Sequence, residues 1–223
     1  MQASRRHLTA VVAGCSLLAI SACAMTGPRA PIMTAPPASF IALGVSAPYL
    51  SGGVIGGERS RAAKLRAAKI RPLAPAAAPS YMAELETELR RQTAGIGLDV
   101  LRVGDSIVVR IPAALTFDAG SVAVKPQFDA TLLEVARTVK TRSRTFVDVY
   151  AHTDTSGSPQ VNQAVSDKRA AAVASYLAGH GVSRARLASR GLGESTPLYN
   201  PDDTETKQAA NRRVEIRLVP FRG

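Results

Sequence analysis

Aromatic side chains are scarce in this sequence. Tryptophan is absent, and aromatic residues make up only 4% of the 223 positions. Clefts that bind sugar rings and platforms that bind nucleic-acid bases rely on stacked aromatic rings. The sequence is therefore poorly supplied for both kinds of site. A glycosidase could use Asp118 and Asp154 as its paired carboxylates, but it would lack the aromatic platform.

Signatures of metal and catalytic sites are also missing. The histidines, His7, His152 and His180, stand far apart, and neither HExxH nor CxxC occurs, so we expect no metal site. No GxSxG motif marks a nucleophilic serine. Gly191 and Gly193 lack the third glycine and the following helix of a dinucleotide-binding loop. We therefore expect neither an enzyme nor a cofactor.

The two cysteines lie close to the N-terminus, in a segment with the pattern of a signal peptide. Basic residues precede an apolar run at 8–20, which is too short to be a comfortable membrane span. The sequence at 20–23, ISAC, resembles a bacterial lipobox, which predicts a signal peptide at 1–22 and acyl chains such as palmitate on Cys23. Cys15 ends a similar motif, but its apolar region would be at the lower limit of length. Ala24 implies, by resemblance to lipoprotein sorting rules, export to the outer membrane.

Basic residues outnumber acidic residues. The chain has 28 Lys and Arg against 17 Asp and Glu, which gives a formal net charge of +11. This charge favours an acidic partner such as nucleic acid, an anionic lipid surface or an anionic wall polymer. Because the signal peptide predicts export, we do not expect nucleic acid as the partner.

Residues 23–79 are predicted to be the lipidated cysteine followed by a disordered tether. Residues 24–57 are rich in Pro, Ala, Gly and Ser and have no sustained periodicity, so they cannot bury a core. Residues 58–71, ERSRAAKLRAAKIR, carry six cations and one acid. This segment is either a solvated part of the tether or a helix that lies on anionic headgroups or along the wall polymer. The prolines that follow are expected to end it and to form a semi-rigid spacer.

From residue 80 onward the periodicity alternates between helix and strand. Residues 80–105 are predicted to form a lead-in helix and strand, and residues 106–223 the main domain. The expected elements are a helix from Ser80, a β-hairpin at 98–103 and 106–111, a helix from Pro126, a strand at 146–151, a helix from Asn162, and strands at 187–191 and 214–218. The order β-α-β-α-β-β predicts an α/β (α+β) sandwich whose helices pack on one face of the sheet.

Arg169 falls within the apolar stripe of the helix predicted from residue 162. It lies four residues after Val165 and four before Val173, which places it on the core-facing side. A guanidinium buried there is costly unless an anion faces it. Asp154, in the loop before the helix, is well placed to do so. The residues alone leave open whether this pair is a structural clasp or part of a binding site.

The strings HTDTSGSPQVNQAVSDKRAAAVASYL, ASRGLGESTPL and NRRVEIRLVP resemble the OmpA-like C-terminal domain. The lead-in, with IPAALTFDAGSVAVKP, is similar to lipoproteins of the YiaD type within that family. The resemblance implies non-covalent binding of peptidoglycan, with Asp154 and Arg169 gripping the diaminopimelate residue of the stem peptide.

The resemblance also extends to other positions of the pocket. Asn162 and Asp118 match pocket positions of the family, although Asn162 could equally be the N-cap of its helix. Thr153 can add a hydrogen-bond donor near the start of that helix. Arg212 and Arg213 match a basic pair of the family, and either one could reach the ligand.

These observations together imply an outer-membrane lipoprotein whose domain faces the periplasm and anchors the membrane to peptidoglycan. The alternative is an envelope protein that uses its basic surface to bind an anionic polymer or lipopolysaccharide. Polyanion binding by a surface weakens steeply with salt, whereas a pocket that holds a zwitterion should lose much less affinity.

Overall fold

The computed structural model describes residues 53–223. The predicted signal peptide, Cys23 and the part of the predicted tether before residue 53 lie outside the described residues. No helix between residues 53 and 223 is long and apolar enough to cross a membrane.

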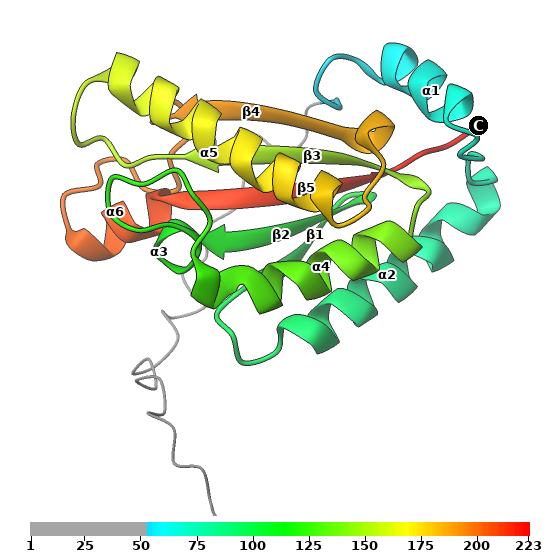
Figure 1. Ribbon diagram of the computed structural model, residues 1–223, viewed down its shortest axis with the longest axis horizontal. Coiled ribbons are helices and arrows are strands. Elements are labelled where there is room, and N and C mark those ends of the chain that lie inside the picture. The colour runs from blue at the N-terminus through cyan, green and yellow to red at the C-terminus, as the bar shows by residue number, and fades with distance from the viewer. Residues whose placement is uncertain (1–52) are drawn as a thin grey trace, which may run out of the picture. The chain divides into compact units, whose positions relative to one another are not determined.

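A five-stranded sheet forms the centre of the fold (Figure 1). Its strands are β1 (Asp99–Val103), β2 (Ser106–Pro112), β3 (Thr145–His152), β4 (Leu187–Gly193) and β5 (Arg213–Pro220). The strand order is β1-β2-β5-β3-β4, in which β3 and β4 are parallel and the other neighbours are antiparallel. The C-terminal strand therefore lies in the middle of the sheet.

Three long helices cover one face of this sheet (Figure 1). These three are α2 (Ala78–Thr93), α4 (Asp129–Thr141) and α5 (Pro159–Gly179). The described residues also form α1 (Glu58–Ala67), α3 (Ala113–Thr116) and α6 (Glu205–Asn211), with 3-10 turns at Pro75–Ala77, Pro126–Phe128 and Arg184–Arg186. Buried residues of α2, α4 and α5 share one core with the sheet. The predicted sandwich, with its helices on one face, is confirmed.

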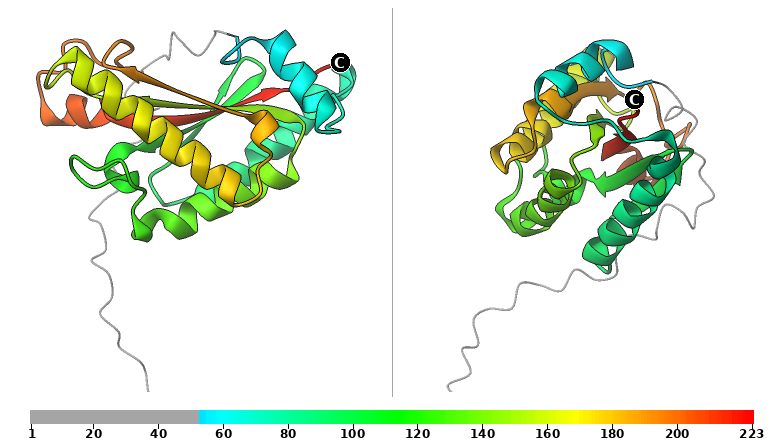
Figure 2. Two further views of the ribbon diagram at one scale, coloured as in Figure 1. Left: turned by 45° about the horizontal axis from the view of Figure 1, so that its top comes forward. Right: turned by 90° about the vertical axis from the view of Figure 1, so that its right-hand side faces the viewer.

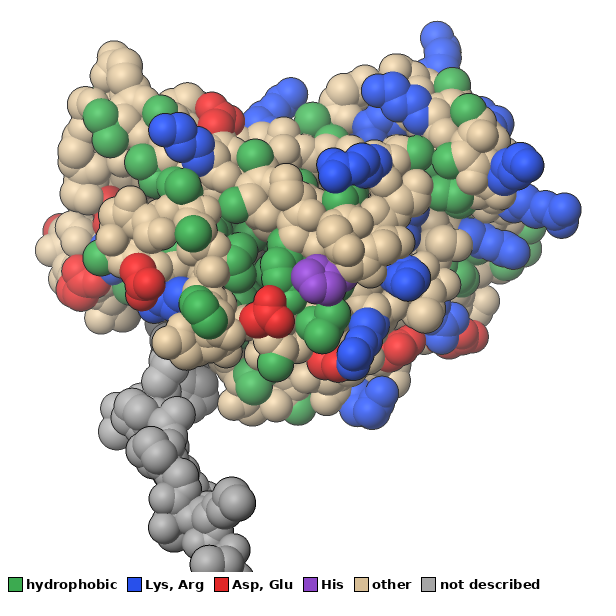
Figure 3. Space-filling model, in the orientation of Figure 1, with side chains coloured by type: hydrophobic (Ala, Val, Ile, Leu, Met, Phe, Trp, Pro, Cys, Tyr) green, Lys and Arg blue, Asp and Glu red, His purple; other side chains and the backbone are tan. Residues whose placement is uncertain are grey.

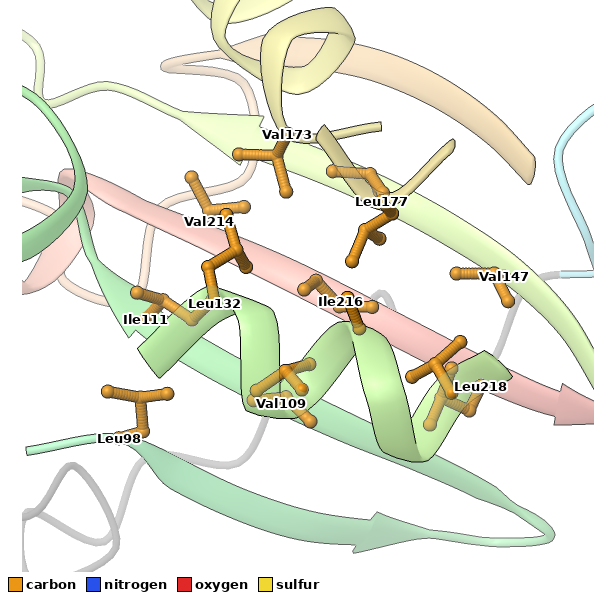
Figure 4. Close-up of a cluster of buried hydrophobic side chains, with 14 of the residues drawn as sticks. Leu98, Val109, Ile111, Leu132, Val147, Val173, Leu177, Val214, Ile216 and Leu218 are labelled. Carbon is orange, nitrogen blue, oxygen red and sulfur yellow. The ribbon is translucent and has the colours of Figure 1, made fainter. Parts of the chain in front are cut away.

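Alternation along the strands fills this core (Figure 4). Val214, Ile216 and Leu218 of β5 are fully buried, and they face Leu132 of α4 and Leu177 of α5 in the same cluster. Burial of one such side chain contributes roughly 1.5–3 kcal/mol. The predicted strand at 214–218 and its core-facing positions are confirmed.

The predicted β-hairpin is present. It joins the lead-in to the main domain, so there is no domain boundary at residue 105. Val103 pairs with Ser106, so the turn consists of two residues. Gly104 is the first of them and has a φ of 56°, which glycine adopts at little cost. Since β1 and β2 are neighbours in one sheet, the lead-in and the main domain form one folded unit.

The tether prediction is wrong for residues 54–79. Helix α1 packs against the domain through Ala62 and Leu65, which share a second hydrophobic cluster with Phe146 and Phe221. The guanidinium of Arg61 is 4% exposed, forms an ion pair with Asp148 and donates a hydrogen bond to the carbonyl of Val147. The carboxylate that holds Arg61, and with it this segment, lies 87 residues later in the chain, so the local sequence does not reveal it.

The prolines after α1 also differ from the prediction, because they do not form a spacer. Pro75 begins a 3-10 turn, and Pro79 is the second residue of α2, where the missing N–H leaves no bond unmade. Helix α2 therefore begins at Ala78 rather than at Ser80, and Ser80 is not its N-cap.

Strand β4 lies very close to α5 at Gly191. A Cβ atom added there would lie 2.2 Å from the backbone nitrogen of Asp167. In the absence of a side chain, the Gly191 N–H donates to the Asp167 carboxylate at 2.8 Å, and the Gly193 N–H donates to Ser166 Oγ at 2.9 Å. These bonds fix the first half of α5 over the parallel strands and thereby position the loop that precedes the helix.

The other face of the sheet buries charged side chains. Glu215 is fully buried and accepts hydrogen bonds from Nε of Arg110 at 3.1 Å and from Nε of Arg213 at 2.8 Å. Nε2 of His152 lies 3.8 Å from its second oxygen. Burial alone would raise the pKa of Glu215, but Arg213, His152 and Arg110 outweigh it and hold this pKa well below its usual range. Glu215 therefore remains ionised.

Candidate functional site

A cleft of about 550 Å³ opens beyond the end of β3, where the chain passes into α5. Six of the predicted site residues line it, together with the loop that follows α3. They are Asp118, Thr153, Asp154, Asn162, Arg169 and Arg212. Ligands commonly bind beyond the carboxyl ends of parallel strands, and β3 with β4 is the parallel pair of this sheet.

Asp154 is only 5% exposed, and its two carboxylate oxygens have different partners. Oδ1 accepts hydrogen bonds from the backbone N–H of Ser156, at 3.1 Å, and from the Ser156 hydroxyl. Oδ2 forms an ion pair with Nη1 of Arg212. Arg212 also pairs with Glu205 at the start of α6. Asp154 thus ties the loop before α5 to the chain that enters β5.

Asp154 and Arg169 both line the cleft, but they form no ion pair with each other, so the reading of a structural clasp is not supported. Arg169 donates through Nε to the carbonyl of Ser121 at 3.0 Å, and its guanidinium carbon lies 5.0 Å from the centre of the Phe117 ring. Within residues 53–223, no carboxylate forms an ion pair with Arg169. Burial lowers the pKa of Arg169, as does the neighbouring charge of Arg212, while Asp154 partly opposes them.

Asn162 organises the loop and is not the N-cap. Ser158 is the N-cap of α5, because its side chain accepts a hydrogen bond from Val161 N–H. Nδ2 of Asn162 donates to the carbonyls of Asp154 and Ser156, at 3.3 and 2.9 Å, and to the carboxylate of Glu194 at 2.5 Å. Asn162 therefore holds the loop that carries Asp154 against the first turn of α5.

Asp118 and Thr153 lie on different walls of the cleft. The Asp118 side chain is 77% exposed and lies 3.2 Å from Nζ of Lys125. Thr153 donates its backbone N–H to Gly193 at 2.9 Å, and its buried hydroxyl has no hydrogen-bond partner among residues 53–223. Both residues line the cleft as predicted, but within residues 53–223 neither forms a hydrogen bond or ion pair with Arg169.

Arg212 and Arg213 separate because successive residues of an extended chain point to opposite sides. Arg212 lines the cleft, whereas Arg213 is fully buried against Glu215 on the far face of the sheet. Of the two arginines that the sequence offered for ligand binding, Arg212 therefore lies in the cleft and Arg213 does not. Its role here is to neutralise a buried carboxylate.

Sequence reasoning missed two residues that shape the cleft. Lys125 adds a cation, and Phe117 forms an apolar surface under Arg169. Both residues lie in the segment FDAGSVAVKP, which was compared with the family but not examined for further cleft residues. The cleft thus contains three cations, Lys125, Arg169 and Arg212, and two carboxylates, Asp118 and Asp154, and it suits a ligand that carries both signs of charge.

No group of three or more His, Cys, Asp or Glu side chains in the described part of the chain is arranged to hold a metal ion.

The part of the chain that contains this cleft is similar to known proteins. The model of the OmpA family matches residues 116–212. A "Probable lipoprotein YiaD" from Escherichia coli K12 is 40% identical over 141 residues, which cover 63% of this chain and 64% of that protein. Outer membrane porin F from Pseudomonas fluorescens is 36% identical over 111 residues, which are 50% of this chain and 34% of the porin. The match thus spans less than two thirds of either relative.

Solved structures agree with this result. A putative MotB-like protein from Desulfovibrio vulgaris has a TM-score of 0.58 and 27% identity, over 66% of this chain and 93% of that one. The cell wall anchor of the T6SS from Pseudomonas aeruginosa has a TM-score of 0.53 and 26% identity, over 59% of this chain and 96% of that one. Every predicted ligand-binding residue except Arg213 falls within the matched residues 116–212. Residues 116–212, which contain most of the cleft, are thus similar to the OmpA family.

Proposed function

We propose that this protein is an outer-membrane lipoprotein that anchors the membrane to the cell wall. Its domain faces the periplasm and binds the diaminopimelate stem peptide of peptidoglycan non-covalently in the cleft. The observation that carries the proposal is Arg169, a cation that is only 8% exposed, lines the cleft and has no carboxylate partner within residues 53–223. A ligand carboxylate would supply the missing counter-charge.

The cleft offers complementary groups for both ends of such a ligand. The side chain of diaminopimelate ends in an ammonium and a carboxylate on one carbon atom. The fork of Arg169 can donate parallel hydrogen bonds to the carboxylate, because only its Nε is used by Ser121. Asp154 can accept from the ammonium through Oδ2, which has one donor, Arg212, and room for another. Asp118 offers a second, more exposed carboxylate at the rim.

The relatives support the wider role. One is named a probable lipoprotein, others are outer membrane proteins, and one solved structure is described as a cell wall anchor. Lipidation at Cys23 would attach the N-terminus to the membrane, and the cleft would attach the domain to the wall.

The decisive experiment is sedimentation with purified peptidoglycan. It uses the mature chain, residues 23–223, with Cys23→Ser so that no lipid is present. Arg169→Lys keeps the charge but loses the planar fork, and we expect binding to diaminopimelate-type peptidoglycan to fall at least tenfold, or about 1.4 kcal/mol. Arg190→Lys is the matched control, because Arg190 is exposed on β4 and does not line the cleft.

A second polymer tests the ligand itself. Peptidoglycan with lysine in the stem peptide keeps the ammonium but lacks the neighbouring carboxylate, so the parent protein should bind it much more weakly. The Arg169→Lys variant should melt within a few degrees of the parent, because its charge is not part of an ion pair that holds the fold. A folded Arg169→Lys variant that sediments like the parent would refute the assigned site.

A further inference from the structure

Helix α1 and the turn after it carry five exposed cations, which we call the α1 cation cluster. They are Arg59, Lys64, Arg66, Lys69 and Arg71. The same stretch has one acid, Glu58, and none of the five cations forms an ion pair within residues 53–223. In Figure 3, blue side chains gather on the right-hand side of the molecule, where Figure 1 places α1.

Docking on the domain gives this cluster a fixed orientation. Arg61, Ala62 and Leu65 are buried against the domain, whereas the five cations of the cluster are exposed, with the Arg66 guanidinium 5.5 Å from the centre of the Phe221 ring. The end of the helix is also fixed, because Ile70 N–H donates to the Leu65 carbonyl at 3.0 Å. Lys69 has a φ of 59°, a conformation for which glycine is favoured. A cation therefore occupies a position that glycine would adopt with less strain.

The cluster and the cleft lie at opposite ends of the same strand. Phe146, near the start of β3, contacts α1 through the ring of Phe221 and through Arg61. His152, at the other end of β3, leads directly into Asp154 in the cleft. Eight residues of strand span roughly 25 Å, so one molecule can present both surfaces at once. Figure 2 shows α1 beside the C-terminus, at the far end from α6.

We propose that the α1 cation cluster docks on an anionic phospholipid surface and so holds the end of the domain opposite the cleft against the membrane. Charge complementarity supports this partner, because clusters of Lys and Arg close to a membrane attract anionic headgroups. Position supports it too: α1 is the first described helix after the N-terminal segment, which the proposed function attaches to the membrane. This argument from position rests on the proposed function, whereas the argument from charge does not.

The contact is with headgroups and not with the acyl interior. An inserted amphipathic helix needs large apolar side chains on its membrane-facing side. In α1 the only large apolar residue, Leu65, is fully buried in the fold, and the remaining non-polar residues are alanines. The α1 cation cluster should therefore bind through charge alone, without inserting an apolar face.

The test measures co-sedimentation with vesicles of phosphatidylcholine, with or without phosphatidylglycerol. The protein is again residues 23–223 with Cys23→Ser. The test variant replaces the whole α1 cation cluster by glutamine, and the control variant removes five exposed cations elsewhere, with the same change in net charge. The control positions are Arg90, Arg91, Arg137, Lys168 and Arg190.

We expect the parent to bind only vesicles that contain phosphatidylglycerol, the test variant to bind at least tenfold more weakly, and the control variant to stay within about twofold of the parent. Arg169→Lys should bind vesicles like the parent, so a failure of the cleft and a failure of this surface are distinguishable. Equal losses in the test and control variants would overturn the proposal, since they would reflect net charge alone. The proposal would also be overturned if the parent protein bound soluble polyglutamate but no vesicle, because the cluster would then recognise polyanions and not a lipid surface.

Discussion

At the scale of single residues, the partner of a buried charge decides what that charge can do. The spacing of residues 165, 169 and 173 correctly placed Arg169 on the inner side of its helix. It could not reveal that Asp154 is already paired with Arg212, which is 58 residues away in the sequence. Because of that pairing, Arg169 faces the cleft with a carbonyl and an aromatic ring as its neighbours. The resulting imbalance of charge is the feature that favours a ligand.

His152 illustrates the opposite case, a residue held neutral by its surroundings. It is 1% exposed, and burial lowers its pKa to about 4, with a further contribution from Arg213 and partial opposition from Glu215. A histidine in the unfolded chain titrates near 6.5. Between these values the unfolded state binds the extra proton and the folded state does not. Stability should therefore be lost as the pH falls from about 6.5 toward 4.

We predict that His152 alone lowers the free energy of unfolding by roughly 2.5 kcal/mol between pH 7 and pH 4.5. Urea titrations at the two pH values measure the difference. His152→Gln should remove most of this dependence, whereas His180→Gln, which changes a partly exposed histidine stacked on Tyr176, should keep it. A pH dependence that is the same in His152→Gln as in the parent would rule out this assignment.

At the scale of elements, local periodicity identified the parts that bury a regular stripe. The strand at 214–218, the hairpin and the helix before Thr141 were predictable because their apolar residues repeat with the period of the element. Helix α1 has no such stripe: it is held by Leu65, Ala62 and a buried arginine. A buried cation and a solvated cation look alike in the sequence, so the helix was taken for part of a tether.

The ion pair between Arg61 and Asp148 should therefore be essential for α1 to dock. Burial raises the pKa of Asp148, and Arg61 opposes this rise. Arg61→Ala would leave the fully buried carboxylate of Asp148 without its cation. We predict a loss of roughly 3–5 kcal/mol in the free energy of unfolding, measured by urea titration.

Arg59→Ala is the control, because Arg59 is exposed two residues earlier on the same helix, and its effect should stay within about 0.5 kcal/mol. Amide exchange gives a local readout. In the Arg61→Ala variant, protection should fall first in α1 while the strands keep theirs. If the two variants were equally stable, α1 would not be held by this pair.

At the scale of the whole molecule, the family resemblance carried the site further than residue physics did. Six of the seven predicted ligand-binding residues line one cleft, although they come from loops and helices spread from residue 118 to residue 212. Periodicity alone could not bring these segments together, because their proximity depends on the strand order β5-β3-β4. The seventh, Arg213, was misplaced because one step along an extended chain reverses the direction of a side chain.

The same scale separates two kinds of charge recognition in one protein. In the cleft, opposite charges would contact the ligand directly and partly out of water, whereas the α1 cation cluster is exposed to solvent. Salt at about 0.5 M instead of about 0.05 M shortens the screening length from ~14 Å to ~4 Å. Exposed charges lose most of their attraction under this change, and buried contacts lose little.

We therefore predict that the higher salt concentration weakens vesicle binding at least tenfold and peptidoglycan binding by no more than about threefold. Sedimentation of the parent protein with each partner, in the same buffers, measures both effects. For the α1 glutamine variant, the higher salt concentration should weaken peptidoglycan binding as little as it does for the parent, because the substitutions lie at the other end of β3 from the cleft. Equal, steep losses for both partners would mean that the wall is also bound by surface charge, and that the alternative of a polyanion-binding surface is correct.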